Sequence, residues 1–120
     1  MAIDYSFHVD GNLLRVKASG RDENLEEVMA YGLAIIETAK ESGCTRVLCD
    51  ELELDYALGT FDTFEAAKFI AEQVPGVARV AIVCKQEQAD DAEFWETVAT
   101  NRGMSVRMFH DLEEAEAWIR

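Results

Sequence analysis

The fold is decided by the stretch Val77-Ala78-Arg79-Val80-Ala81-Ile82-Val83-Cys84. Its apolar residues continue without polar alternation, which is typical of a strand covered on both faces in the middle of a sheet. Pro75-Gly76, directly before it, ends a helix that we expect over residues 60–74. A further helix is expected over residues 89–102, because apolar residues recur there at helical spacing. A buried strand between two helices predicts parallel strands in an α/β fold.

Patterns typical of strands and of helices also extend to both ends of the chain. Alternating polarity on either side of Asp10-Gly11-Asn12 predicts a β-hairpin, and Asp111, with Glu114 three residues later, has the spacing of a helix capping box. The predicted strands span 5–9, 14–18, 45–50, 77–84 and 105–110, and the helices span 24–42, 60–74, 89–102 and the segment after 111. We therefore predict an α/β fold of order β-β-α-β-α-β-α-β-α, with four helices and a mixed, mostly parallel five-stranded sheet, in one domain over residues 1–120.

Residues 51–59 are the hardest segment to assign. The run Glu51-Leu52-Glu53-Leu54-Asp55 alternates, so we expect an edge strand or extended loop whose acids point to water. Asp50 ends the preceding strand, and ligands of open α/β sheets bind beyond the carboxyl ends of parallel strands. The acids there have the oxygen ligands of a Mg²⁺ or Ca²⁺ site, but no calcium-binding loop motif is present, and we predict no metal.

Composition and charge narrow the classes of function. The formal net charge of −13 disfavours partners with phosphate backbones, so we expect no nucleic-acid binding. No apolar run approaches the length of a transmembrane segment, and the start of the chain lacks the pattern of a signal peptide. The cysteines, Cys44, Cys49 and Cys84, have no CxxC spacing and predict buried free thiols in a reducing compartment. We therefore expect a cytoplasmic protein.

No catalytic constellation is evident in the sequence. His110 follows a strand and has the chemistry of a general base, but no recognised motif places a nucleophile beside it. The glycines are dispersed as turns and caps, and no phosphate-binding loop occurs. We predict a protein that is not an enzyme and that needs no cofactor.

One apolar and aromatic set surrounds the acidic segment and gives two alternatives. Its members are Leu54, Tyr56, Leu58, Phe61 and Phe64, to which Asp50 adds a carboxylate at the strand end. If part of the set is exposed, it marks a site for a protein partner, a second copy of the chain or an apolar ligand. If it is buried, it closes the core under a long loop.

The order of elements resembles the SpoIIAA-like family, which is related in fold to STAS domains and to Sec14/CRAL-TRIO lipid-transfer domains. The resemblance rests on the hairpin, the long first helix, the two central strands and above all the closing run Phe109-His110-Asp111-Leu112-Glu113-Glu114-Ala115-Glu116-Ala117-Trp118-Ile119. It implies a βα superhelix whose strands lie in roughly sequential order. In STAS antagonists a Ser or Thr at the start of the helix after the third strand is phosphorylated. The corresponding candidates here are Thr60 and Thr63, although the segment lacks the Ser-Gly pair of that motif, and both also suit the start of a helix.

These observations lead to ranked hypotheses for function. The first is a non-enzymatic regulatory or protein-interaction module of STAS type, which acts on a protein partner or as a homodimer. The alternative is a carrier or sensor of a small apolar or lipid-like ligand, as the Sec14 relation implies. An enzyme of unrecognised type is the third.

Overall fold

Five strands and four α-helices follow one another in the predicted order. The computed structural model describes residues 2–120. The elements are β1 (Ile3–Asp10), β2 (Leu13–Asp22), α1 (Leu25–Glu41), β3 (Arg46–Tyr56), α2 (Thr60–Gln73), β4 (Arg79–Val83), the short 3₁₀ helix η1 (Gln86–Gln88), α3 (Ala89–Asn101), β5 (Val106–Phe109) and α4 (Leu112–Ile119). The predicted α/β fold class is confirmed.

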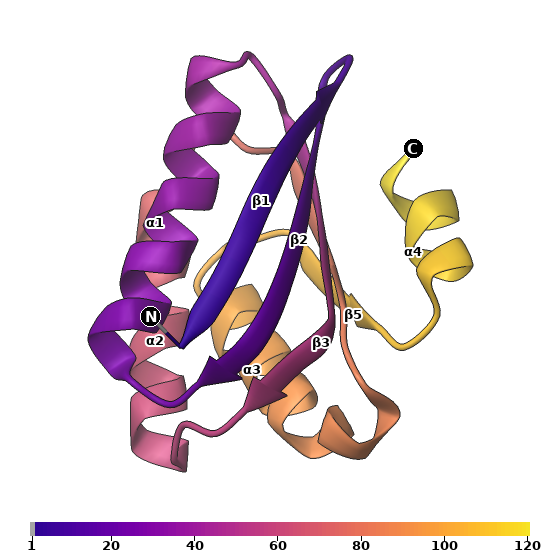
Figure 1. Ribbon diagram of the computed structural model, residues 1–120. Helices are drawn as coiled ribbons and strands as arrows, with labels where there is room; N and C mark the ends of the chain where they lie inside the picture. The colour runs from indigo at the N-terminus through magenta and orange to yellow at the C-terminus, as the bar shows by residue number, and fades with distance from the viewer. Residues whose placement is uncertain (1) are drawn as a thin grey trace.

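The sheet has the strand order β1-β2-β3-β4-β5. The hairpin strands β1 and β2 are antiparallel, whereas β2, β3, β4 and β5 run parallel. Right-handed crossovers that always step to the next strand in one direction must place their helices on one face of the sheet. Figure 1 shows α1, α2 and α3 on that face and α4 on the opposite one. We call these the inner face and the outer face.

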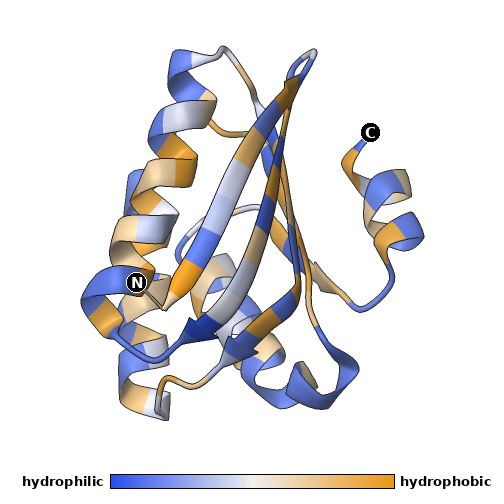
Figure 2. Ribbon diagram, in the orientation of Figure 1, coloured by the Kyte–Doolittle hydropathy of each residue, from blue (hydrophilic) through white to orange (hydrophobic). Residues whose placement is uncertain are grey.

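Alternation along the strands divides the side chains between the two faces. On β2 the inner residues Leu14, Val16 and Ala18 are buried against the helices, whereas the outer residues Arg15 and Lys17 are partly or fully exposed. The short strand β4 is buried on both faces, as its unbroken apolar run predicts. Figure 2 shows this contrast, with hydrophobic residues along the central strands and hydrophilic ones at the start of α3.

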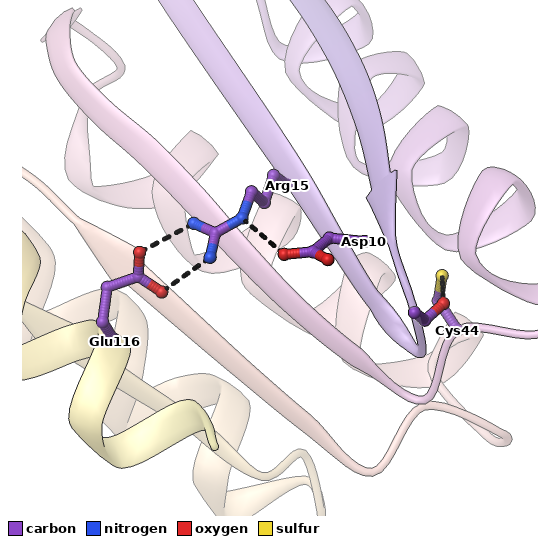
Figure 3. A network of polar contacts seen from close by, with 5 residues as sticks. Asp10, Arg15, Cys44 and Glu116 are labelled. Atoms are coloured by element: carbon purple, nitrogen blue, oxygen red, sulfur yellow. Dashed lines mark hydrogen bonds and ion pairs between the residues drawn. The ribbon is translucent and has the colours of Figure 1, made fainter.

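Helix α4 is held on the outer face by apolar packing and one ion pair. Its buried residues Ala115 and Ile119 pack in a second core cluster with β3, β4 and Phe109. The guanidinium of Arg15 donates two hydrogen bonds to the Glu116 carboxylate, at 2.8 and 3.0 Å. Figure 3 shows this bidentate pair joining β2 to α4. The resulting contact lowers the pKa of Glu116, mainly because Arg15 donates to its charged form.

Strand β3 is longer than predicted and carries an irregularity that changes which residues face inward. It continues to Tyr56 instead of ending near residue 50. Lys17 pairs with Asp50 but Ser19 pairs with Glu53, so β3 contributes one extra residue at this point, as in a β-bulge. Glu51 continues the alternation of the inward residue Cys49, so it faces inward and is 7% exposed, and the extra residue after it turns Leu54 and Tyr56 to the same face. The prediction that all acids of this segment point to water is wrong for Glu51, because the buried strand continues through this residue.

The start of α2 also differs from expectation. Gly59, not Thr60, is the N-cap residue, and no side chain caps the helix. Thr63 lies in the first turn as predicted, where its hydroxyl donates to the carbonyl of Gly59 at 2.9 Å. Asp111 does cap α4, accepting a hydrogen bond from the amide of Glu113.

Candidate functional site

A largely apolar cavity of about 100 Å³ lies between the inner face of the sheet and the three helices. Its apolar and small lining residues are Val28, Gly32, Ile35, Ile36, Val47, Cys49, Leu54, Leu58, Ile70, Val77, Val80, Ile82, Met104 and Met108. Tyr31, Tyr56 and Trp95 add aromatic rings, and Asp22, Glu51, Thr63 and Asp91 add polar groups. A void large enough for several water-sized groups is uncommon in a close-packed interior, which makes this cavity the candidate functional site.

Gly32 lies at the contact between α1 and α2 beside this cavity. A Cβ atom at residue 32 would come within 2.5 Å of the Ile70 side chain, so glycine is what lets α1 approach α2 so closely.

Two tyrosines donate hydrogen bonds to the buried Glu51 carboxyl at one side of the cavity. The hydroxyl of Tyr31 donates to Oε2 at 2.7 Å, and the hydroxyl of Tyr56 donates to Oε1 at 2.5 Å. Burial raises the pKa of Glu51, and the two hydrogen bonds oppose that effect because they favour the charged carboxylate. Each oxygen accepts one tyrosine hydrogen and retains capacity for another donor.

Asp22 is a second carboxyl at the polar side of the cavity. It ends β2 and accepts a hydrogen bond from the amide of Ala57 at 2.6 Å. Burial, with smaller contributions from the charges of Glu51 and Asp91, raises its pKa to about 7. The charges of two neighbouring carboxyls therefore act on Asp22.

Gln88 fixes the end of β3 beside this site. Strand β4 ends at Val83, so the last residues of β3 have no strand partner on that side. The Gln88 side chain makes the hydrogen bonds that a neighbouring strand would make. It accepts from the amide of Tyr56 at 2.7 Å and donates to the carbonyl of Leu54 at 3.1 Å. Tyr56 is thereby held where its hydroxyl reaches Glu51.

The candidate residues from the sequence divide into three places. Leu54, Tyr56 and Leu58 line the cavity. Phe61 projects into solvent with 72% of its surface exposed. Asp50 lies on the outer face, 3.4 Å from Lys17 and separated from the cavity by the sheet. Each of the two alternatives predicted for this apolar and aromatic set is therefore correct for some of its members, because some are buried in the core and Phe61 is exposed.

The other aromatic and hydroxyl candidates lie along α2. The ring of Phe64 is partly buried, with the Arg102 guanidinium 5.0 Å from its centre. Thr63 is buried and its hydroxyl is engaged within the helix, whereas Thr60 is exposed in the first turn. Of the two threonines, only Thr60 has a side chain that is accessible to solvent.

Sequence reasoning missed Glu51, Asp22 and Tyr31 as members of a site. A glutamate inside an alternating acidic run has no pattern that distinguishes it from its solvated neighbours. Tyr31 lies on the apolar side of its helix, where helical spacing gives it no role beyond packing. A useful signal lies before the acidic run, because the alternation of Val47 and Cys49 continues to Glu51 and places it on the inner face.

The environment of His110 does not favour nucleophilic catalysis. Its Nδ1 lies 3.0 Å from the carbonyl oxygen of Cys84 and 3.7 Å from the Cys84 sulfur. Burial raises the pKa of Cys84 to about 11, so its thiol stays protonated near neutral pH. Within residues 2–120, no three His, Cys, Asp or Glu side chains are grouped so that they could hold a metal ion.

Comparisons with solved structures identify the fold. The structure of an anti-sigma factor antagonist from Mycobacterium paratuberculosis aligns with a TM-score of 0.69 and 13% identity, covering 98% of this chain and 94% of that one. An uncharacterised protein of the DUF3478 family from Shewanella loihica, with a SpoIIAA-like fold, aligns with a TM-score of 0.61 and 20% identity, covering 99% and 94%. This chain has a SpoIIAA-like fold. The predicted resemblance is confirmed at the level of fold, including the sequential strand order.

No protein-family model and no curated protein sequence matches the chain. Among the described residues, none of the helices combines the length and apolar character needed to cross a membrane.

Proposed function

We propose that this protein is a regulatory module of STAS type that acts by contacting another protein through the start of α2. The observation that carries the proposal is Phe61, which at 72% is the most exposed large hydrophobic side chain among residues 2–120. An aromatic ring in this position costs solvation in the free protein and stabilises a complex when a partner covers it. The similar structure from M. paratuberculosis is named an anti-sigma factor antagonist, which supports a protein as the partner.

The chemistry of this surface favours a partner with basic or polar groups around an apolar pocket. Asp62 and Glu65 lie beside Phe61 in the first turns of α2, and the whole chain carries a formal charge of −13. Complementary charge speeds association and excludes acidic partners. We further propose Thr60, exposed next to Phe61, as the position where phosphorylation would change that contact.

Photo-crosslinking tests the contact surface directly. A benzophenone amino acid in place of Phe61 should yield one defined crosslinked species, either with a partner from the source cells or with a second copy of the chain. The same group in place of Val9, which is 46% exposed at the distant hairpin, is the matched control. Phe61→Asp in the uncrosslinked protein should abolish co-purification of that species. Equal labelling from both positions, or a monomer without any species specific to residue 61, contradicts the proposal.

The second candidate function is that of a carrier or sensor of a small apolar ligand. It is favoured by the cavity of about 100 Å³, whose surface is mostly apolar. Native mass spectrometry of the purified protein, before and after extraction with organic solvent, should show a bound mass that extraction removes. A protein that is empty as purified and takes up no added apolar compound contradicts this candidate.

A further inference from the structure

We propose that the cavity binds a small organic cation, an ammonium compound with a compact apolar body, and that Glu51 receives its charged group. The inference rests on the second candidate function, ligand binding in the cavity, and adds the charge and chemical class of the ligand. It is carried by four features of the cavity: the sign of its charged groups, its aromatic rings, the partners of Glu51 and its size.

The charged groups that line the cavity are all acidic. Asp22, Glu51 and Asp91 contribute carboxyls, and no Lys, Arg or His is among the lining residues. A low-dielectric cavity with one sign of charge attracts the opposite sign and rejects its own. Anionic ligands such as fatty acids or phosphorylated compounds are therefore disfavoured.

Aromatic rings accompany the carboxyls. Tyr31, Tyr56 and Trp95 all line the cavity, and the two tyrosines are the residues that hold Glu51. The faces of tyrosine and tryptophan rings attract ammonium groups, and several rings around one site are a recurrent way to bind such ligands. Apolar side chains from α1, α2 and the strands supply the rest of the surface, which suits the body of such a ligand.

Glu51 has no cationic partner among residues 2–120. Its hydrogen bonds come from two neutral hydroxyls, whereas the ion pairs in this part of the chain involve other acids. Removing a carboxylate from water is costly unless a cation lies beside it, so a bound ammonium group would stabilise the charged form of Glu51. A neutral ligand would fill the same space but would not stabilise the charged form of Glu51.

The shape of the site favours an organic cation over a metal ion. The three carboxyls line one cavity, but within the described residues they do not converge as metal ligands do. A cavity of about 150 Å³ holds a benzene ring, so a cavity of about 100 Å³ takes only a small ligand. An aromatic ring with a short aminomethyl substituent would fill it and extend toward its acidic side.

The acidic side of the cavity lies nearest to solvent. Asp91 is exposed on α3, and Leu58 is only partly buried in the segment between β3 and α2. A cation attracted by the surface would therefore meet Asp91 and Asp22 first and Glu51 last.

Isothermal titration calorimetry with three compounds of similar size tests the assignment at neutral pH. Benzylamine is cationic, benzyl alcohol is neutral and benzoate is anionic. We expect benzylamine to bind at least tenfold more tightly than benzyl alcohol, and benzoate not to bind. Glu51→Gln should weaken benzylamine at least tenfold and change benzyl alcohol less than twofold.

Glu53→Gln is the matched control, because Glu53 lies two residues along the same strand but is exposed beside Lys17 on the outer face. It should leave the affinity for all three compounds unchanged. Asp22→Asn provides a second variant, expected to weaken benzylamine, in case Glu51→Gln does not fold as judged by circular dichroism. Benzyl alcohol binding as tightly as benzylamine overturns the cation assignment but leaves apolar ligand binding standing. Failure of all three compounds to bind overturns both.

Discussion

Glu51 and its two tyrosines form a small unit in which each member depends on the others. The carboxyl is buried, and both of its oxygens are occupied by hydroxyls from separate elements, α1 and β3. Removing one donor leaves a buried acceptor only partly satisfied, which costs more than the hydrogen bond itself contributes. Changes to these few polar atoms are therefore expected to alter the free energy of unfolding strongly, although most of the cavity surface is apolar.

Tyr31→Phe tests this unit. We expect it to lower the free energy of unfolding by about 1–3 kcal/mol, because Glu51 loses one of its two donors while the ring is retained. Urea denaturation measures the change. Tyr5→Phe is the control, since Tyr5 is 37% exposed, and should change stability by less than about 0.5 kcal/mol. Equal effects of the two substitutions would show that the Tyr31 hydroxyl does not support Glu51.

Asp22 predicts a particular dependence of stability on pH. Its pKa of about 7 in the folded protein exceeds the value of about 3.9 in an unfolded chain, so between these values the folded state holds a proton that the unfolded state lacks. Stability contributed by this group is complete below pH 4 and is lost as pH rises through 7. Because Asp22 is partly exposed, we expect a loss of about 2 kcal/mol.

Asp22→Asn should remove that loss while keeping an acceptor for the amide of Ala57. Urea denaturation of both proteins at intervals from pH 4.5 to 8 gives the two curves. They should diverge steadily, with the variant relatively more stable at the higher pH. Parallel curves would mean that Asp22 titrates near its ordinary value.

At the scale of elements, the hairpin and β3 place Glu51 on the inner face. Gly20 lies in β2 close to the bulge, with φ of 105°, and a Cβ there would be 2.0 Å from the carbonyl oxygen of Ala2. Gly11, at the hairpin turn, has φ of 63° but no atom within 4 Å of that position. Both residues need a left-handed backbone, but only Gly20 also needs the space.

Gly20→Ala should therefore destabilise the protein by more than about 2 kcal/mol, whereas Gly11→Ala should cost about 1 kcal/mol. Thermal unfolding followed by circular dichroism measures both. If the two costs are equal, the close approach of Ala2 to β2 is not a real constraint on the hairpin.

Helix α4 lies on the outer face, opposite the other described α-helices, and its attachment can be tested separately. Arg15→Lys keeps the positive charge but loses the bidentate contact with Glu116, and Arg15→Ala removes both. We expect Arg15→Ala to lower stability by about 1 kcal/mol, with Arg15→Lys in between, and to increase amide hydrogen exchange in α4. Unchanged exchange in α4 with Arg15→Ala would show that apolar packing alone holds it.

The elements themselves were largely predictable because they depend on local patterns. The unbroken apolar run of β4 and the Pro75-Gly76 break indicated a central strand and a helix end, and both are present. The extent of β3 was not predictable in the same way. Its last residues are held by Gln88, 32 residues after Tyr56, and its bulge depends on pairing with β2. The site has the same limit, since the inward placement of Tyr56, which donates to Glu51, depends on that bulge.

Over the whole molecule, the SpoIIAA-like arrangement separates the two proposed activities in space. The contact surface around Phe61 is exposed at the start of α2, and the cavity lies beneath the same helix. Leu58, three residues before Phe61, lines the cavity, so the short segment between β3 and α2 adjoins both. The acidic character of the chain suits each proposal, since it favours a basic partner outside and an organic cation inside.

Methyl NMR of the isoleucines tests most directly whether the cavity is a binding site. Of the chain's isoleucines, Ile35, Ile36, Ile70 and Ile82 line the cavity, whereas Ile3 and Ile119 do not. Titration of isoleucine-labelled protein with benzylamine should shift the four cavity methyl signals together, at one affinity, and leave Ile119 on the outer face unchanged. Shifts centred on Ile119, or none at any isoleucine, would contradict the account.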